Sequence, residues 1–308
     1  MSTNRRRAGR TVSAAVVVAA LVAVAGACGG DSDAKGGSGL SIGLGGIPQD
    51  QGGQTLTYWN VPEVMRLTRQ DEQLYGALSG FGIPEVAQAR YEEEPARVAL
   101  GFDETTVDTS VQIGSDAARL TGRFDVAAVT GAMRQRGWTE TKSDGAPLLT
   151  QDGARVSVSS SVRSSSSARN TALPPLTGPG ASVATDPAYR AVADCIGEDA
   201  YHATFYGKDR RGQLSGLTLF AIGARAGADG TSTERLCAVT RSAEAARAVA
   251  AALRPETAAG KRFAGARVEV GEGSAPVVTM RWANSTSGLR PGSQNQTAEL
   301  PRLLAPLR

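Results

Sequence analysis

Only one of the 308 residues in this chain, His202, is a histidine. A serine or cysteine nucleophile needs a base beside it, so any such mechanism that uses an imidazole depends on His202. This residue lies in the segment YHATFY (201–206), where period-two alternation predicts a strand with His202, Thr204 and Tyr206 on one face. We expect a structural histidine and keep a hydrolase that uses His202 as an alternative hypothesis.

Acidic residues offer a second possible chemistry. Asp103, Glu104 and Asp108 follow an expected strand and could supply the paired carboxylates of a glycosidase. Aromatic residues, which usually hold a sugar, make up only 5% of the chain, so we expect no glycosidase. The acidic run 92–94 precedes Pro95 without any ligand spacing and is interpreted as a solvated face. We therefore expect no metal and no cofactor.

The N-terminus has the composition of an export signal. Four arginines (Arg5, Arg6, Arg7 and Arg10) precede an apolar run, 11–27, that is built almost wholly from alanine and valine. A positive region, an apolar region and a small-residue cleavage site together predict a signal peptide. A spanning helix needs about 20 residues, which makes this run short for an uncleaved anchor, the alternative interpretation. The sequence leaves open whether export follows the general secretory or the twin-arginine route.

The end of this run carries the most specific motif of the chain. In Val24–Cys28 (VAGAC), small residues precede Cys28, and glycines follow it. The stretch resembles the lipobox of bacterial membrane lipoproteins, with Ala25 at the position where leucine is usual. The resemblance implies cleavage before Cys28, a diacylglyceryl thioether on its sulfur, and N-acylation in many bacteria. It places the protein on the extracytoplasmic face of the cell membrane, anchored by lipid. Arginine outnumbers lysine 29 to 4, and with the lipobox this bias resembles actinobacterial lipoproteins.

Cys195 and Cys237 are the two cysteines besides Cys28. In an oxidising, exported setting such a pair predicts one disulfide, here closing a loop of about 42 residues. Two free buried thiols are the alternative. Two cysteines and a single histidine do not build a tetrahedral zinc site.

Charge excludes one class of partner. The formal net charge of +3 includes the four arginines of the expected signal peptide, so the mature chain is close to neutral. Nucleic-acid binding requires clustered positive charge. We therefore expect no nucleic-acid partner.

The spacing of apolar residues predicts helices and strands along the rest of the chain. A helix or a helix pair is expected over 61–79 (capped by Asn60), and helices over 125–137, 186–197 and 242–254. Strands are expected over 97–102, 118–124, 138–141, 146–150, 154–159, 201–206, 216–223, 234–239, 262–270 and 276–282. The segment 107–113 fits either type. Arg119-Leu120, followed by a strand, a cap and a helix, recurs 116 residues later as Arg235-Leu236. This recurrence indicates either two related units or chance similarity.

These patterns predict an α+β fold made of two similar sheet-plus-helix units joined by a Ser/Pro-rich linker. The expected divisions are the signal peptide 1–27, a Gly-rich flexible tether 28–54, a first unit 55–160, a linker or long loop 161–182, a second unit 183–282 and a polar C-terminal tail 283–308. The tether contains ten glycines within 29–53, and eight serines within 157–167 lead into the linker.

A lipid anchor without a recognisable catalytic site predicts a membrane-anchored cell-envelope lipoprotein that is non-enzymatic, with a binding or structural role. Its partner would be another envelope protein or a small ligand. An alternative is a carrier of a small or lipidic ligand, which requires a pocket of more than about 300 Å³. The hydrolase that uses His202 is the third hypothesis.

Overall fold

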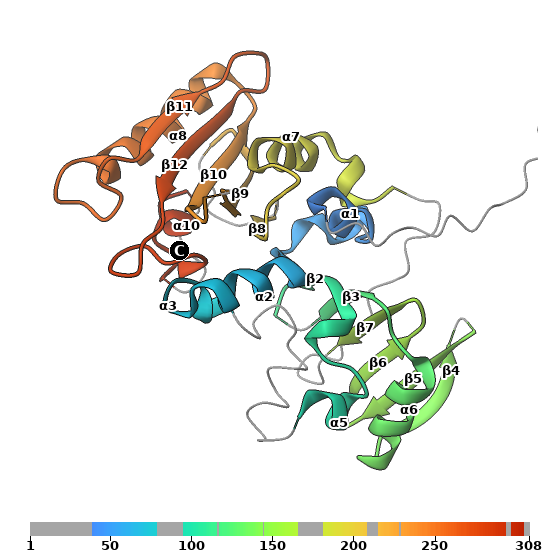
Figure 1. Ribbon diagram of the computed structural model, residues 1–308. Helices are drawn as coiled ribbons and strands as arrows, with labels where there is room; N and C mark the ends of the chain where they lie inside the picture. The colour runs from blue at the N-terminus through green and yellow to red at the C-terminus, as the bar shows by residue number, and fades with distance from the viewer. Residues whose placement is uncertain are drawn as a thin grey trace, which may run out of the picture. The chain divides into compact units, whose positions relative to one another are not determined.

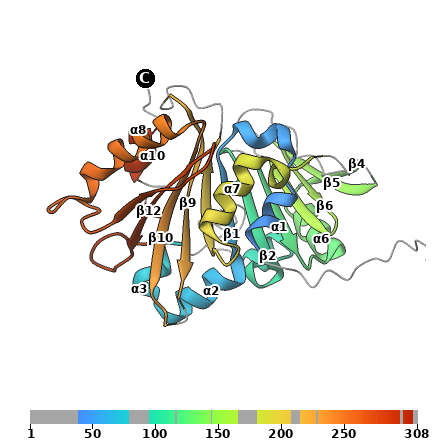
Figure 2. The ribbon, with the colours of Figure 1, turned by 90° about the horizontal axis from the view of Figure 1, so that it is seen from above.

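A computed structural model describes residues 39–78, 95–115, 117–143, 145–165, 181–207, 215–227, 229–293 and 297–304 (Figures 1 and 2). They belong to one compact unit that spans Gly36–Arg308. The expected signal peptide, Cys28 and the segment 166–180 lie outside the described residues. Within the ranges given above, no helix has the length and apolar character needed to cross a membrane.

The described part of the chain is α+β, and its strands form one antiparallel sheet. In spatial order the strands are β11 (Arg267–Val270), β12 (Val277–Ala283), β10 (Ser232–Thr240), β9 (Leu217–Ala226), β8 (His202–Tyr206), β1 (Leu56–Asn60), β2 (Val107–Ile113), β3 (Ala117–Gly122), β7 (Ser161–Ser165), β6 (Ala154–Val158), β5 (Ala146–Gln151) and β4 (Thr139–Ser143). The helices are α1 (Leu40–Gly45), α2 (Val61–Gln70), α3 (Glu72–Tyr75), α5 (Ala96–Leu100), α6 (Val126–Gln135), α7 (Pro187–Ile196), α8 (Ala243–Leu253) and α10 (Glu299–Leu304).

The helices cover both faces of this sheet. Side chains of a strand alternate between the faces, so both faces present apolar residues against which helices pack. On one face, α1 and α7 lie side by side and pack against Tyr58, Phe205 and other apolar strand residues (Figure 2). The opposite face carries two further cores. One is built by α2, α3, α5 and α6 around Trp59 and Leu120, and the other by α8 and α10 around Phe220.

Strands β1 and β8 join the two halves of the sheet. They pair antiparallel, with Leu56 opposite Phe205 and Trp59 opposite His202. On its other side β1 pairs with β2, and β8 pairs with β9. The strands expected to belong to two separate sheets therefore lie in one continuous sheet.

Local sequence explains several helix boundaries. The side chain of Asn60 accepts a hydrogen bond from the backbone N–H of Glu63, which caps α2 as the sequence predicts. Asp125 caps α6 in the same way, at 2.9 Å from the N–H of Ala127. Gly137, with φ +87, follows α6 in the left-handed conformation that glycine adopts without strain.

One predicted strand is wrong. Residues 97–100 of the segment 97–102 (RVALGF) belong instead to helix α5, which starts after Pro95 and is followed by Gly101 with φ +75. Ala96 and Ala99 are buried at helical spacing, whereas Val98 is 61% exposed. A short apolar run fits a strand or a helix, and here the flanking proline and glycine favour the helix.

Three segments expected to be loose are folded in part. From residue 39 onward the expected tether forms α1 and the 3-10 helix Gln49–Gly53, because Leu40, Leu44 and Ile47 are buried under the sheet. The start of the expected linker is strand β7, which pairs with β3 and β6 and whose serines are buried. In the expected tail, Leu289 and the apolar side of α10 are buried against α8 and its core. These segments have a low apolar content, but several of their apolar side chains are buried and hold the segments in the fold.

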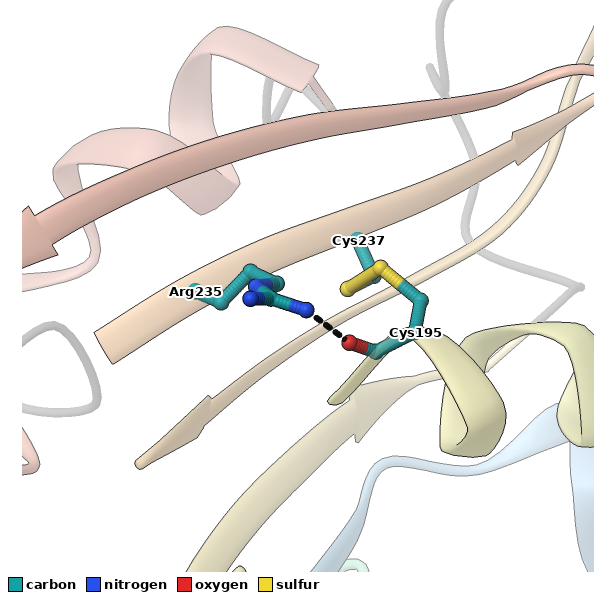
Figure 3. Close-up of a disulfide and its surroundings, with 3 residues drawn as sticks. All are labelled: Cys195, Arg235 and Cys237. Carbon is teal, nitrogen blue, oxygen red and sulfur yellow. Dashed lines mark hydrogen bonds between the residues drawn. A yellow bond between two sulfur atoms is a disulfide. The ribbon is translucent and has the colours of Figure 1, made fainter. Parts of the chain in front are cut away.

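The predicted disulfide is present. Cys195 of α7 and Cys237 of β10 are bonded, with 6.2 Å between their Cα atoms (Figure 3). Beside it, Arg235 Nη1 donates a hydrogen bond of 2.5 Å to the carbonyl oxygen of Cys195 (Figure 3). The disulfide therefore fixes the C-terminal end of α7 to strand β10 of the sheet.

We predict that the free energy of unfolding of the double variant Cys195→Ala, Cys237→Ala is about 3 kcal/mol lower than that of the oxidised protein. Without the disulfide, the unfolded chain regains the conformational freedom of a 42-residue loop. Urea denaturation followed by circular dichroism measures this difference. Under reducing conditions the two proteins should differ by much less. Equal stability of both proteins in the absence of reductant would contradict the prediction.

Candidate functional site

The centre of the sheet presents a polar floor on the face opposite α1 and α7. Two cross-strand rows form it. In the first row His202 of β8 lies opposite Trp59 of β1. In the second, Thr204 lies opposite Thr57, which in turn lies opposite Gln112 of β2. Directly paired residues project from the same face of a sheet, so these side chains share one surface.

A cavity of about 390 Å³ lies over this floor. Its lining residues are Thr55, Thr57, Trp59, Ala77, Leu78, Gln112, His202, Thr204, Tyr206, Pro291, Gly292, Ala298 and Pro301. The walls come from two distant parts of the chain, the 3-10 helix Gly76–Leu78 and residues 291, 292, 298 and 301 near the C-terminus. The volume exceeds the 300 Å³ or so that a small-molecule site requires.

The two walls touch each other at Gly292. Its φ is +74, and a Cβ atom at this position would lie 2.8 Å from Leu78 Cδ2. A larger residue would require the side chain of Leu78 to shift and would be strained in its backbone. The positive φ therefore favours glycine at this point of the wall.

His202 is buried in the floor and packs against Trp59. Its side chain is 2% exposed, and the two rings meet edge to face with 5.3 Å between their centroids. Burial disfavours the charged imidazolium and lowers the pKa of His202 to about 4. The imidazole is therefore neutral at neutral pH.

The other polar groups of the floor are uncharged as well. The hydroxyl of Thr204 donates to that of Thr57 at 3.4 Å. Trp59 is 5% exposed, and its indole N–H has no hydrogen-bond acceptor among the described residues. Tyr206 stacks on Phe220, with 4.5 Å between ring centroids. The cavity thus combines hydrogen-bonding groups with aromatic and aliphatic surface and contains no formal charge at neutral pH.

A buried carboxylate holds the C-terminal wall in place. Glu234 of β10 accepts hydrogen bonds from the indole N–H of Trp282, the side-chain amide of Asn284 and the backbone N–H of Gly292, at 3.0, 3.0 and 2.8 Å. Burial raises the pKa of Glu234, and these three donors oppose that shift. All three partners are donors, and an ionised carboxylate only accepts hydrogen bonds. These bonds connect Glu234 to Gly292 of the C-terminal wall.

The backbone of the floor is engaged in strand pairing. An oxyanion hole needs backbone N–H groups or other donors aimed at the developing charge. In β1 and β8 the backbone is paired with a neighbouring strand on both sides. The floor therefore offers side-chain hydrogen bonds and apolar contact, with no backbone N–H group left over for such a hole.

One hydrolase-like pattern was missed at the sequence level, namely Gly-x-Ser-x-Gly at Gly39–Gly43 (GLSIG). The structure places its serine, Ser41, in the first turn of α1, where the hydroxyl donates to the carboxylate of Glu198. Helix α1 covers the face of the sheet opposite to the one that presents His202. The serine and the imidazole are therefore not a catalytic pair.

The other candidate residues stay apart from the cavity. Asp103 receives a hydrogen bond of 2.8 Å from Arg97 and one of 2.9 Å from the N–H of Thr105, so it is a local capping residue. Glu104 and Asp108 are not among the lining residues. The run 92–94 lies outside the described residues. In the part of the chain that the structure describes, no group of three or more His, Cys, Asp or Glu side chains could hold a metal ion.

Sequence reasoning identified the His202 face but missed most of the site. The alternation of Thr55, Thr57 and Trp59 is a strand signal that could have matched the pattern of Thr204 and Tyr206. The walls had no such signal, because only the fold brings Leu78 and Gly292 together.

Neither a protein-family model, nor a curated protein, nor a solved structure matches this chain.

We predict that protonation of His202 at low pH lowers the free energy of unfolding of the protein. The folded-state pKa is about 4, below the unfolded value of about 6.5, so the unfolded chain binds this proton first as the pH falls. Stability due to the neutral imidazole is complete above the unfolded value and is lost between these two values, by about 3 kcal/mol. Urea titrations across this range should show the loss in the wild type relative to His202→Gln. Parallel pH profiles for the two proteins would refute the assignment.

We also predict that Glu234→Ala destabilises the protein by about 3 kcal/mol, because three buried donors lose their acceptor. Hydrogen exchange at the amide of Gly292 should accelerate. Glu269→Ala, a change at an exposed carboxylate on β11, serves as the matched control. Unchanged protection at Gly292 in the Glu234 variant would show that the wall is held by other contacts.

Proposed function

We propose that this chain is a non-enzymatic, membrane-anchored lipoprotein of the cell envelope whose folded part binds a small ligand. The observation that carries the proposal is the uncharged cavity of about 390 Å³ over the junction of β1 and β8. Ligand sites are typically concave and largely apolar, with a few convergent polar groups. The cavity has this composition.

The location rests on the N-terminal sequence. The export signal and Val24–Cys28 support lipidation of Cys28, and a thioether-linked lipid would hold the domain at the extracytoplasmic face of the membrane. The disulfide supports the same compartment, because such bonds persist in oxidising environments. Residues 29–38 would then connect the anchor to α1.

Binding is favoured over turnover by the chemistry of the floor. The imidazole of His202 is buried beside Trp59, and the backbone beneath the cavity is engaged in strand pairing. Hydrolysis by His202, the alternative from the sequence, would need a nucleophile and an oxyanion hole in the same cavity. The hydroxyls of Thr57 and Thr204 are bonded to each other. A carrier or receptor role requires none of these groups to react.

We further propose that the two halves of the sheet are related units, as the recurrence of Arg119 and Arg235 indicates. Each half has three antiparallel strands that are adjacent in chain order (β1-β2-β3 and β8-β9-β10), followed by a helix and further strands, of which the last (β7 or β12) pairs with the third strand. In this pairing Arg119 lies opposite Arg163, and Arg235 lies opposite Arg281.

A second correspondence supports this relation. Arg119 Nη1 donates to the carbonyl of Gly46, directly after α1, and Arg235 Nη1 donates to the carbonyl of Cys195, near the end of α7. Each half thus places a cation at the C-terminal end of the helix that precedes its first strand, where the helix dipole favours it. The ligand site would then lie at the junction of the two units, across their first strands.

The anchor is tested with Cys28→Ala. We expect the wild type to fractionate with membranes and the variant to appear in the soluble extracytoplasmic fraction, because a lipid-modified cysteine is required for anchoring. Ser32→Ala, in the same segment, should remain membrane-bound. Unchanged fractionation of Cys28→Ala, or mass spectrometry showing an intact leader, would overturn the proposed location.

The binding role is tested with Ala77→Trp, which fills the cavity from its wall. Native mass spectrometry of protein purified from its own cells should show a bound small molecule in the wild type and none in the variant. Val98→Trp, at an exposed position of α5, is the matched control. If neither the wild type nor the control carries a small molecule, a role with an envelope protein as partner replaces the binding of a small ligand.

A further inference from the structure

Three partly exposed polar side chains of the cavity floor are the polar groups that a ligand can reach. Thr55 and Thr57 of β1 and Gln112 of β2 line the cavity, and each keeps part of its surface accessible. The other polar and aromatic residues of the lining are buried, namely Trp59, His202, Thr204 and Tyr206. We call Thr55, Thr57 and Gln112 the polar strip.

The members of the polar strip lie close enough together to contact one molecule. Thr57 lies directly opposite Gln112 in the pairing of β1 with β2. Side chains paired in this way have Cβ atoms about 5 Å apart. Thr55 precedes Thr57 by two residues, so it projects from the same face about 7 Å further along the strand. The strip therefore extends over two strands and along β1.

The polar strip has hydrogen-bonding capacity that the protein leaves unused. The hydroxyl of Thr57 accepts from that of Thr204, so its own hydrogen remains for an acceptor outside this pair. Among the described residues no hydrogen bond engages the amide of Gln112 or the hydroxyl of Thr55. A side-chain amide offers two donors and one acceptor, and a hydroxyl both donates and accepts. A head group that complements the strip must therefore accept and donate hydrogen bonds.

The lining also disfavours a charged ligand. The described lining residues include no Asp, Glu, Lys or Arg, and burial keeps His202 neutral at neutral pH. A charged group placed here would lose its hydration without gaining a counter-charge. An uncharged hydroxyl both donates and accepts, so it meets the requirement of the strip without this cost.

The walls determine the rest of the ligand. They are lined by the aliphatic residues Ala77, Leu78, Pro291, Ala298 and Pro301. A molecule that fits the whole cavity has a polar head on the polar strip and an aliphatic body between these walls. The volume of about 390 Å³ corresponds to about a dozen water molecules, which suits a compact molecule.

Building on the proposed binding role, we propose that the cavity takes an uncharged aliphatic compound with two adjacent hydroxyl groups, a 1,2-diol, and that Gln112 selects this head group. One hydroxyl oxygen accepts from the hydroxyl of Thr57, and the other hydroxyl exchanges hydrogen bonds with the amide of Gln112. A single hydroxyl reaches only part of a strip that extends over two strands, whereas hydroxyls on neighbouring carbons contact both. The aliphatic part packs against Leu78 and the two prolines.

The experiment uses four probes of equal chain length, namely 1,2-octanediol, 1-octanol, octanoate and octylammonium. They are titrated at neutral pH into the full-length chain carrying Cys28→Ala, with the backbone amide resonances of β1 and β2 followed in correlation spectra. We expect 1,2-octanediol to bind at least about tenfold more tightly than either ion and at least about threefold more tightly than 1-octanol. Comparable or tighter binding of an ion would overturn the neutral class, and equal binding of 1-octanol would overturn the diol.

Variants of Gln112 test its role as the selecting residue. Gln112→Leu removes the amide and should weaken 1,2-octanediol by about threefold or more while 1-octanol is unchanged. Gln112→Glu keeps the shape but supplies a counter-charge, so octylammonium should bind at least about tenfold more tightly than to the wild type. Neither change removes a hydrogen bond between described residues, and circular dichroism should confirm that both variants are folded.

Matched controls use Gln135, an exposed residue at the end of α6 that does not line the cavity. Gln135→Leu and Gln135→Glu should leave all four affinities unchanged. An effect of Gln135→Glu on octylammonium as large as that of Gln112→Glu would show that overall charge, rather than the polar strip, sets the preference. Unchanged diol binding in Gln112→Leu would refute the role of Gln112.

The outcomes separate this inference from the proposed function. Failure of 1,2-octanediol to bind would overturn the diol class, whereas the test for a co-purified molecule in wild type and Ala77→Trp decides the binding role by itself. A co-purified molecule that Ala77→Trp excludes, but that is charged or has no hydroxyl groups, would retain the cavity as a ligand site and refute the diol.

Discussion

The antiparallel pairing of β1 with β8 is the interaction on which the rest of the structure depends. It joins seven strands on one side to five on the other, and each of the two strands is hydrogen-bonded on both edges. Because strand pairing fixes which residues face each other, this one register determines that Trp59 meets His202 and that Thr57 meets Thr204. A shift by one residue would turn these polar side chains into the apolar core beneath α1 and α7.

The same pairing explains why polar residues occupy the middle of a large sheet. The face under α1 and α7 is apolar and continuous across the junction, with Tyr58 and Phe205 on either side of it. On the opposite face the helices divide into two groups with separate cores, one containing Leu78 and the other containing Leu300. The central strands lie between these groups, so their side chains border a cavity that neither core fills. One face therefore stabilises the junction, and the other borders the cavity.

The sequence predicted elements whose determinants are local. Asn60, Asp125 and Ser242 begin helices because their side chains accept hydrogen bonds from nearby backbone N–H groups, and this depends on neighbours within three residues. The mixed α+β class, the disulfide and the shared face of His202 and Thr204 followed from composition and periodicity alone. The assignment of 97–102 as a strand failed because a segment of six residues is too short to distinguish the helical period from the strand period.

Features that depend on distant contacts could not be predicted in this way. Nothing near Leu40 or Leu300 indicates that a glycine-rich and a polar segment will be held by a few buried leucines. The same is true of Glu234, whose three partners follow it by about fifty residues or more. The walls of the cavity are a tertiary property, so the sequence could suggest a histidine-bearing face but not the cavity above it.

The two outer strands of the sheet have a consequence for how one copy of the protein meets another. An unpaired strand edge is a template for joining another chain. Strand β4 bears the exposed Glu140 and Lys142, and β11 bears the exposed Arg267 and Glu269. Charged side chains on both edge strands disfavour edge-to-edge pairing with another copy. A wide sheet can therefore remain monomeric and need not extend into a fibre.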